Sequence, residues 1–185
     1  MKLPSYSELK GTHALFSASK PAWIRYDIQK MREAVAAKKA SERGTELHAL
    51  AEMHIKNMIR MPRTNKTLDR YINDAISYRM TPEQVLYFSP FFYGTADAID
   101  FDEQRGTLRI HDLKTGKGPT HMEQLLIYAA FFCLQTGVRP SDIEAVLRIY
   151  QNDDIQEMHA TASDIVPIME QAKKFNDIIR EEELA

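Results

Sequence analysis

Residues 94–128 constrain the fold of this chain most strongly. They include most of two runs rich in β-branched and aromatic residues, at 93–101 and 107–114, which are separated by a polar turn at 102–106. Such runs around a short glycine-containing loop predict an antiparallel hairpin. An apolar segment at 120–135 follows, and its length predicts a helix. A hairpin followed by a helix is therefore the expected centre of the fold.

Helices are expected before this centre, and further strands and a helix after it. The expected elements are helices at 21–39, 45–61 and 67–79, strands at 85–88, 143–150 and 157–161, and a closing helix at 163–182. Ser41–Gly44 is expected to separate the first two helices, and a strand at 85–88 is preferred to a capped helix beginning at Thr81. Hairpins with a helical crossover predict an α/β fold, with a mixed sheet flanked by helices.

The single cysteine and the short apolar runs exclude several classes of protein. Cys133 alone allows no disulfide within the chain, no four-cysteine zinc site and no four-cysteine iron–sulfur cluster. The longest apolar run, at 125–134, has ten residues, too few to cross a bilayer. The first eleven residues contain no apolar signal segment. We therefore expect a soluble cytoplasmic protein with no membrane partner.

Charge is distributed unevenly along the 185 residues. Residues 1–80 contain 15 lysines and arginines against 8 acidic residues, whereas residues 81–185 contain 9 against 18. A basic half can hold phosphates, and an acidic half can hold cations. We expect a single domain at 1–185, with a helical lobe at 1–80 and a catalytic α/β core at 81–185. The alternative is that exposed helix surfaces simply differ in charge.

Two aspartates continue apolar rows on the expected hairpin. Asp97 precedes an alternating apolar row on the first strand, and Asp112 and Lys114 end such a row on the second. A buried, unpaired carboxylate costs several kcal/mol, so each aspartate needs a counter-charge. A structural ion pair between Asp112 and Lys114 is one solution. A hard divalent cation held by both aspartates is the other.

Two other kinds of catalytic site find little support. A phosphate-binding loop of the form GxxxxGK[ST] would require glycine at position 111 and serine or threonine at 118, where the chain has His111 and Gly118. Cys133 lies in an apolar run, which is typical of a core cysteine rather than a nucleophile.

Four short motifs occur in a recognisable order along most of the chain. They read RGTELH at 43–48, GTAD at 94–97, DLK at 112–114 and QLLIY at 124–128. An opening serine motif, Ser17-Ala18-Ser19 with Trp23, precedes them. In this order the motifs resemble those of the RecB-like nucleases of the PD-(D/E)XK superfamily. The resemblance is greatest to small phage exonucleases and to CRISPR-adaptation nucleases.

The resemblance implies a role for each motif residue. His48, Asp97, Asp112 and the backbone carbonyl of Leu113 are expected to bind one or two Mg²⁺ or Mn²⁺ ions, and Lys114 to position or activate the attacking water. Gln124 and Tyr128 are expected to steady the catalytic site. The residues expected to contact nucleic acid are Ser17, Ser19, Trp23, Arg43, Lys117 and Tyr128.

The function implied by the resemblance is a metal-dependent deoxyribonuclease. It is expected to be an exonuclease on single-stranded or duplex DNA ends, in phage DNA processing, recombination or repair, in the cytoplasm of a bacterium or a phage-infected cell. Unlike some relatives, the chain has no helicase domain and no cysteines for an iron–sulfur cluster, so a homo-oligomer or a helicase or recombination partner is expected. RNA stays open as a substrate. The alternative is a non-cleaving module on the same fold that binds nucleic acid or recruits a partner.

Overall fold

The structure is a computed structural model, and it describes residues 7–9 and 11–183. The chain divides into two compact units, residues 1–45 and residues 46–185. The division falls within a helix, α1 (Ile28–Lys56). Residues 46–80 therefore belong to the same compact unit as the strands.

The unit of residues 1–45 contains two short 3-10 helices and the first part of α1. The 3-10 helices are Ser7–Leu9 and Pro21–Arg25. The Trp23 indole donates a hydrogen bond to the Ser17 carbonyl at 2.9 Å, and the hydroxyls of Ser17 and Ser19 lie 2.8 Å apart. The apolar side chains expected to form a buried helix face here are exposed, as Ile24 at 70% shows.

Helix α1 corrects two boundaries that the sequence predicted. The expected break at Ser41–Gly44 is wrong, because α1 runs through it without interruption. A glycine within a helix costs about 1 kcal/mol, and helix-forming residues on both sides offset this cost. Within the helix, the Thr45 hydroxyl donates to the Ser41 carbonyl at 3.2 Å. The α-helix also begins at Ile28 rather than at Pro21.

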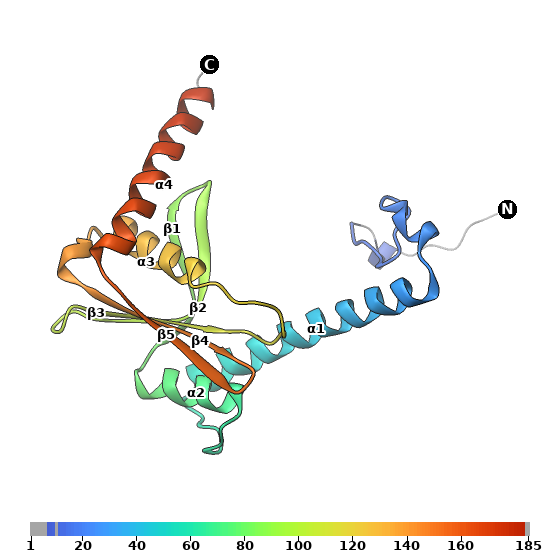
Figure 1. The fold of residues 1–185 in the computed structure, drawn as a ribbon, viewed down its shortest axis with the longest axis horizontal. Coiled ribbons are helices and arrows are strands. Elements are labelled where there is room, and N and C mark those ends of the chain that lie inside the picture. Colours follow the sequence, from blue (N-terminus) through green and yellow to red (C-terminus); the bar gives the residue numbers. More distant parts are fainter. Residues whose placement is uncertain (1–6, 10, 184–185) are drawn as a thin grey trace. The chain divides into compact units, whose positions relative to one another are not determined.

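Five strands of the unit 46–185 form one mixed sheet, in the order β1-β2-β3-β4-β5 (Figure 1). The strands are β1 (Thr81–Ser89), β2 (Phe92–Asp102), β3 (Thr107–Leu113), β4 (Glu144–Gln151) and β5 (Asp154–Ala160). Neighbouring strands are antiparallel except β3 and β4, which are parallel. The predicted strands are confirmed, and so is the predicted α/β class with a mixed sheet.

Helices cover both faces of this sheet, as predicted. On one face lies α2 (Thr67–Ser77), and on the other lie α3 (Glu123–Thr136) and α4 (Ala162–Glu183) (Figure 1). A short 3-10 helix, Pro140–Asp142, precedes β4. Helix α3 makes the crossover between the parallel strands and ends at Gly137, whose φ of +77° gives the left-handed cap that the sequence predicts.

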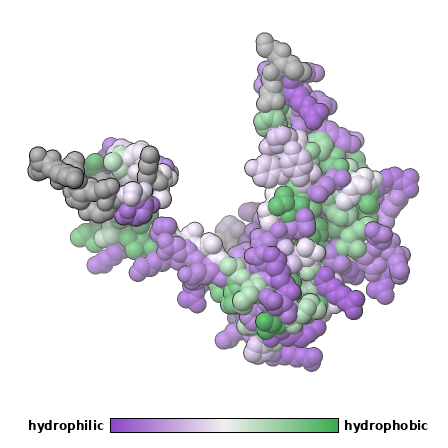
Figure 2. Space-filling view, turned by 180° about the vertical axis from the view of Figure 1, so that it is seen from behind, coloured by the Kyte–Doolittle hydropathy of each residue, from purple (hydrophilic) through white to green (hydrophobic). Residues whose placement is uncertain are grey.

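Each face of the sheet has its own apolar core. Leu108, Ile110 and Leu147 pack with α3 and α4, whereas Leu113 and Tyr150 pack with α2 and the last turns of α1. On the outer surface, hydrophobic and hydrophilic residues are interspersed (Figure 2). Within residues 7–9 and 11–183, no helix combines the length and apolar character that crossing a bilayer requires.

Candidate functional site

Acidic side chains occupy neighbouring positions on the first two strands. Pro82 of β1 pairs with Ala98 of β2, so the next residue of β1, Glu83, lies opposite Asp97 of β2. The backbone of Glu83 has a φ of +50°, a conformation that residues other than glycine adopt uncommonly. Such local strain occurs often at functional sites.

The irregularity at Glu83 changes which side chains of β1 face α3. Thr81 and Gln84 line the same hollow between the sheet and α3. In a regular strand, residues three apart point to opposite faces. The turn of the backbone at Glu83 therefore breaks the alternation of β1, at the position opposite Asp97.

A third carboxylate extends the row onto β3. Ala98 of β2 pairs with His111 of β3, which places Asp97 opposite Asp112. Asp97 also accepts a hydrogen bond at 2.7 Å from the backbone N–H of Leu113. Three adjacent strands thus present three carboxylates side by side, and two of them were predicted from the sequence.

His48 of α1 completes the cluster. Its Nδ1 lies 3.6 Å from Asp97 Oδ1 and 3.9 Å from Glu83 Oε1. One ligand atom from each of His48, Glu83 and Asp97 lies within 4.8 Å of the other two. An imidazole nitrogen with carboxylate oxygens is a ligand set for a divalent cation. These three residues can therefore hold a metal ion.

Asp112 adds a buried oxygen that lacks a partner. Its side chain is buried, and Oδ1 accepts a hydrogen bond at 3.0 Å from Lys114 Nζ. Its other oxygen, Oδ2, is buried without a hydrogen-bond partner among the residues that the structure describes. An unsatisfied buried carboxylate oxygen is costly, so this atom fits a bound cation or a proton.

A chain of hydrogen bonds joins Asp112 to α3. Lys114 Nζ donates to Gln124 Oε1 at 2.8 Å, and Gln124 Nε2 donates to Tyr128 Oη at 3.1 Å. Gln124 and Tyr128 are one helical turn apart, so both project from the same side of α3. The structure thus brings together Asp97, Asp112, Lys114, Gln124 and Tyr128, the residues that the sequence assigned to catalysis.

The carboxylates of the cluster are held against their tendency to ionise. Burial, followed by the charge of Asp112, raises the pKa of Asp97 to about 6, although the Leu113 N–H opposes the rise. Burial also raises the pKa of Asp112, against the opposing charge of Lys114, and the pKa of Glu83. Crowded, desolvated carboxylates of this kind favour a bound cation.

The other predicted site residues divide between the two units. The Leu113 N–H positions Asp97, and the metal-binding role of its carbonyl stays a prediction. Lys117 and Lys114 line a hollow of about 230 Å³ beside α2. The remaining residues expected to contact nucleic acid belong to the unit 1–45, outside the unit that contains the cluster: Ser17, Ser19, Trp23 and Arg43.

Glu83 is the site residue that the sequence reasoning missed. Together with Thr81, it was considered only as part of a possible helix cap. The available signal was an acidic residue directly after a proline at the start of a β-rich run. No short motif contains it, because its partners come from other strands and from α1.

Comparison with known proteins finds no match to this chain among protein-family models, curated proteins or solved structures. A functional proposal therefore depends on the geometry of the site and on the order of the motifs.

Gly94 gives a structural test of the Tyr128 position. A Cβ at residue 94 would lie 2.8 Å from Cε1 of Tyr128, closer than real contacts allow. We expect Gly94→Ala to lower the free energy of unfolding by about 1 to 3 kcal/mol, and to cost nothing in a Tyr128→Ala background. Chemical denaturation measures both values. Gly116→Ala, where a Cβ meets open space, is the control. An equal cost in both backgrounds would contradict the contact.

Carboxylate crowding gives a second test, in the metal-free protein. The pKa of Asp97 is about 6 in the folded state against a usual 3.8, so its ionisation opposes folding above pH 6 and has no effect below about pH 4. We therefore expect Asp97→Asn to stabilise the protein in EDTA at pH 7.5 by about 1 to 3 kcal/mol. At pH 4 the gain should disappear.

The measurement is urea denaturation at both pH values. Asparagine can still accept the hydrogen bond from the Leu113 N–H. The control is Asp154→Asn, at an exposed position of β5, which should change stability little at either pH. Equal destabilisation by Asp97→Asn at both pH values would show that the carboxylate is not under electrostatic strain.

Proposed function

We propose that the chain is a metal-dependent phosphodiesterase that cleaves nucleic acid, and specifically a deoxyribonuclease with the PD-(D/E)XK fold. One observation supports this most directly. Asp112 has a buried oxygen without a partner, lies opposite Asp97, and is joined through Lys114 to Gln124. A purely structural ion pair between Asp112 and Lys114 would require neither the neighbouring carboxylates nor His48.

The ligand set favours Mg²⁺ or Mn²⁺. His48, Glu83, Asp97 and Asp112 would hold the ion, with oxygen as the main donor and one imidazole nitrogen. When bound, such an ion supplies positive charge that stabilises a phosphate under attack and makes a water molecule more acidic. The raised pKa values of the carboxylates fit a site that is electrostatically complete only with a cation.

Lys114 is suited to orient the nucleophile. Its ammonium group has three N–H donors, of which two are directed to Asp112 and Gln124. The third donor is available for a water molecule or for a phosphate oxygen. Because two fixed acceptors hold the ammonium group, the direction of this third donor is restricted, which favours a reactive geometry.

Tyr128 is suited to hold a phosphate oxygen. Its hydroxyl oxygen accepts a hydrogen bond from Gln124, which leaves the O–H proton free to donate. Burial raises the pKa of this hydroxyl, so Tyr128 keeps its proton at neutral pH. Gln124 thus fixes both Lys114 and Tyr128, and acts as a positioning residue.

Within this proposal, the substrate is a DNA end, single-stranded or duplex, and the products come from exonuclease action. This part follows the resemblance to phage-type RecB-like nucleases. A homo-oligomer or a helicase or recombination partner would present the end to the site.

The proposal is tested with end-labelled single-stranded and duplex DNA in Mg²⁺ or Mn²⁺. We expect metal-dependent digestion from one end, abolished by EDTA. Loss of a positioned polar group of this kind costs on the order of 100-fold or more in rate, so Lys114→Ala and Asp112→Asn should fall at least that far. Lys173→Ala, at an exposed position of α4, is the matched control and should keep full activity.

Undiminished cleavage by both site variants would overturn the assignment of the site. Binding of DNA without cleavage of any linear, nicked or circular substrate would instead favour the non-cleaving module.

A further inference from the structure

A second cationic surface lies in the unit 46–185, apart from the carboxylate cluster. Residues 56–70 contain five lysines and arginines and one acidic residue, Asp69. Asp69 is buried, and its Oδ2 accepts a hydrogen bond from the Thr64 hydroxyl. This segment therefore presents a strong net positive charge to solvent.

Part of the segment forms a polar hollow of about 290 Å³ against the outer side of α2. The hollow is lined by Arg60, Met61, Arg63, Thr64, Arg70, Asn73, Asp74 and Ser77. Three arginines around one hollow offer many N–H donors in planar groups that match phosphate oxygens.

The arginines are oriented without being neutralised. Arg60 Nη1 donates to Ser77 Oγ at 3.0 Å and to the Asn73 carbonyl at 3.4 Å, and Arg70 Nη1 donates to the Asp153 carbonyl at 3.2 Å. None of Arg60, Arg63 and Arg70 forms an ion pair with a carboxylate among residues 7–9 and 11–183. Their charge is thus available to a ligand.

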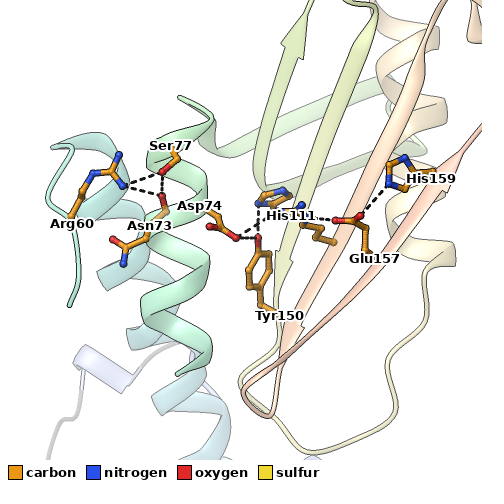
Figure 3. A network of polar contacts seen from close by, with 9 residues as sticks. Arg60, Asn73, Asp74, Ser77, His111, Tyr150, Glu157 and His159 are labelled. Atoms are coloured by element: carbon orange, nitrogen blue, oxygen red, sulfur yellow. Dashed lines mark hydrogen bonds and ion pairs between the residues drawn. The ribbon is translucent and has the colours of Figure 1, made fainter. Parts of the chain in front are cut away.

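The one carboxylate of the hollow is directed elsewhere. Asp74 Oδ2 accepts a hydrogen bond from the Tyr150 hydroxyl at 2.8 Å and lies 3.5 Å from Arg148 Nη1. Figure 3 shows Asp74 pointing toward Tyr150 and His111, whereas Asn73 and Ser77 lie toward Arg60. Arg148 compensates the charge of Asp74 on the sheet side of α2, so the hollow on its outer side keeps a positive character.

We propose that this arginine hollow binds the phosphodiester backbone of a nucleic acid strand. The assignment rests on the proposed function for the nature of the strand. Helix α2 connects the hollow to the site: Thr67 and Leu68 at its start line the hollow that contains Lys114 and Lys117, and Asn73 and Ser77 line the arginine hollow. The eleven residues of α2 extend about 16 Å.

This length favours a polymer over a small anion. Phosphates of a strand in a duplex follow one another at about 3.4 Å along the axis, so α2 spans roughly four to five of them. A strand with regularly spaced charges can occupy both hollows at once, whereas a single phosphate can occupy only one. The arginine hollow would therefore hold the strand a few nucleotides away from the cluster.

The test is the affinity of the full chain for a fluorescein-labelled thymidine 12-mer, measured by fluorescence anisotropy in EDTA. Arg63 forms no hydrogen bond or ion pair among the described residues, so Arg63→Glu should fold normally. We expect this variant to weaken binding at least tenfold. Because each lost phosphate contact to a single strand lowers the salt slope by about 0.7, Arg60→Ala/Arg63→Ala should lower it by about 1.4.

The matched control is Arg105→Glu, the same charge change at an exposed arginine of the β2–β3 turn, which should change affinity less than twofold. If Arg63→Glu binds like this control, the proposal is overturned. It is also overturned if thymidine monophosphate displaces the 12-mer from the wild type at equal concentration, since the site would then recognise a small phosphate. Loss of binding in Arg63→Glu with no cleavage by the wild type would uphold the strand site and refute the phosphodiesterase.

Discussion

Repulsion between buried carboxylates is the constraint on which the rest of the site depends. Asp97 and Asp112 face one another on neighbouring strands, with little water to screen them. The surrounding groups each answer part of this charge: the Leu113 N–H bonds to Asp97, and Lys114 bonds to Asp112. One oxygen of Asp112 is still unsatisfied within the described part of the chain. A cation would complete what these contacts leave unfinished, and nothing else in the site supplies that charge.

The elements that position the carboxylates could be predicted because their signals are local. The hairpin follows from alternating apolar residues around a glycine turn, and α3 from an apolar run closed by Gly137. Asp97, Asp112 and Lys114 were found because each interrupts or ends such a run. Gln124 and Tyr128 were found because they occupy one side of a helix that follows directly.

The features that escaped prediction depend on contacts distant in sequence or on small energy differences. Glu83 acquires its role only through the pairing of β1 with β2, and its φ of +50° leaves no mark in the sequence. The break expected at Ser41–Gly44 failed because a helix tolerates one glycine when its flanks are strong. The arginine hollow was missed because its charges lie in a connection and on α2, where the sequence does not show that Asp74 points away from them.

The central claim is that the cluster binds a divalent cation, and calorimetric titration of the metal-free protein with Mn²⁺ tests it most directly. Wild type should bind Mn²⁺, and Glu83→Gln should bind it at least several-fold more weakly, because Glu83 Oε1 belongs to the cluster with His48 and Asp97. Asp154→Asn, an exposed carboxylate of β5, should bind as wild type does. Absence of binding in the wild type, or equal affinity in Glu83→Gln, would contradict the account.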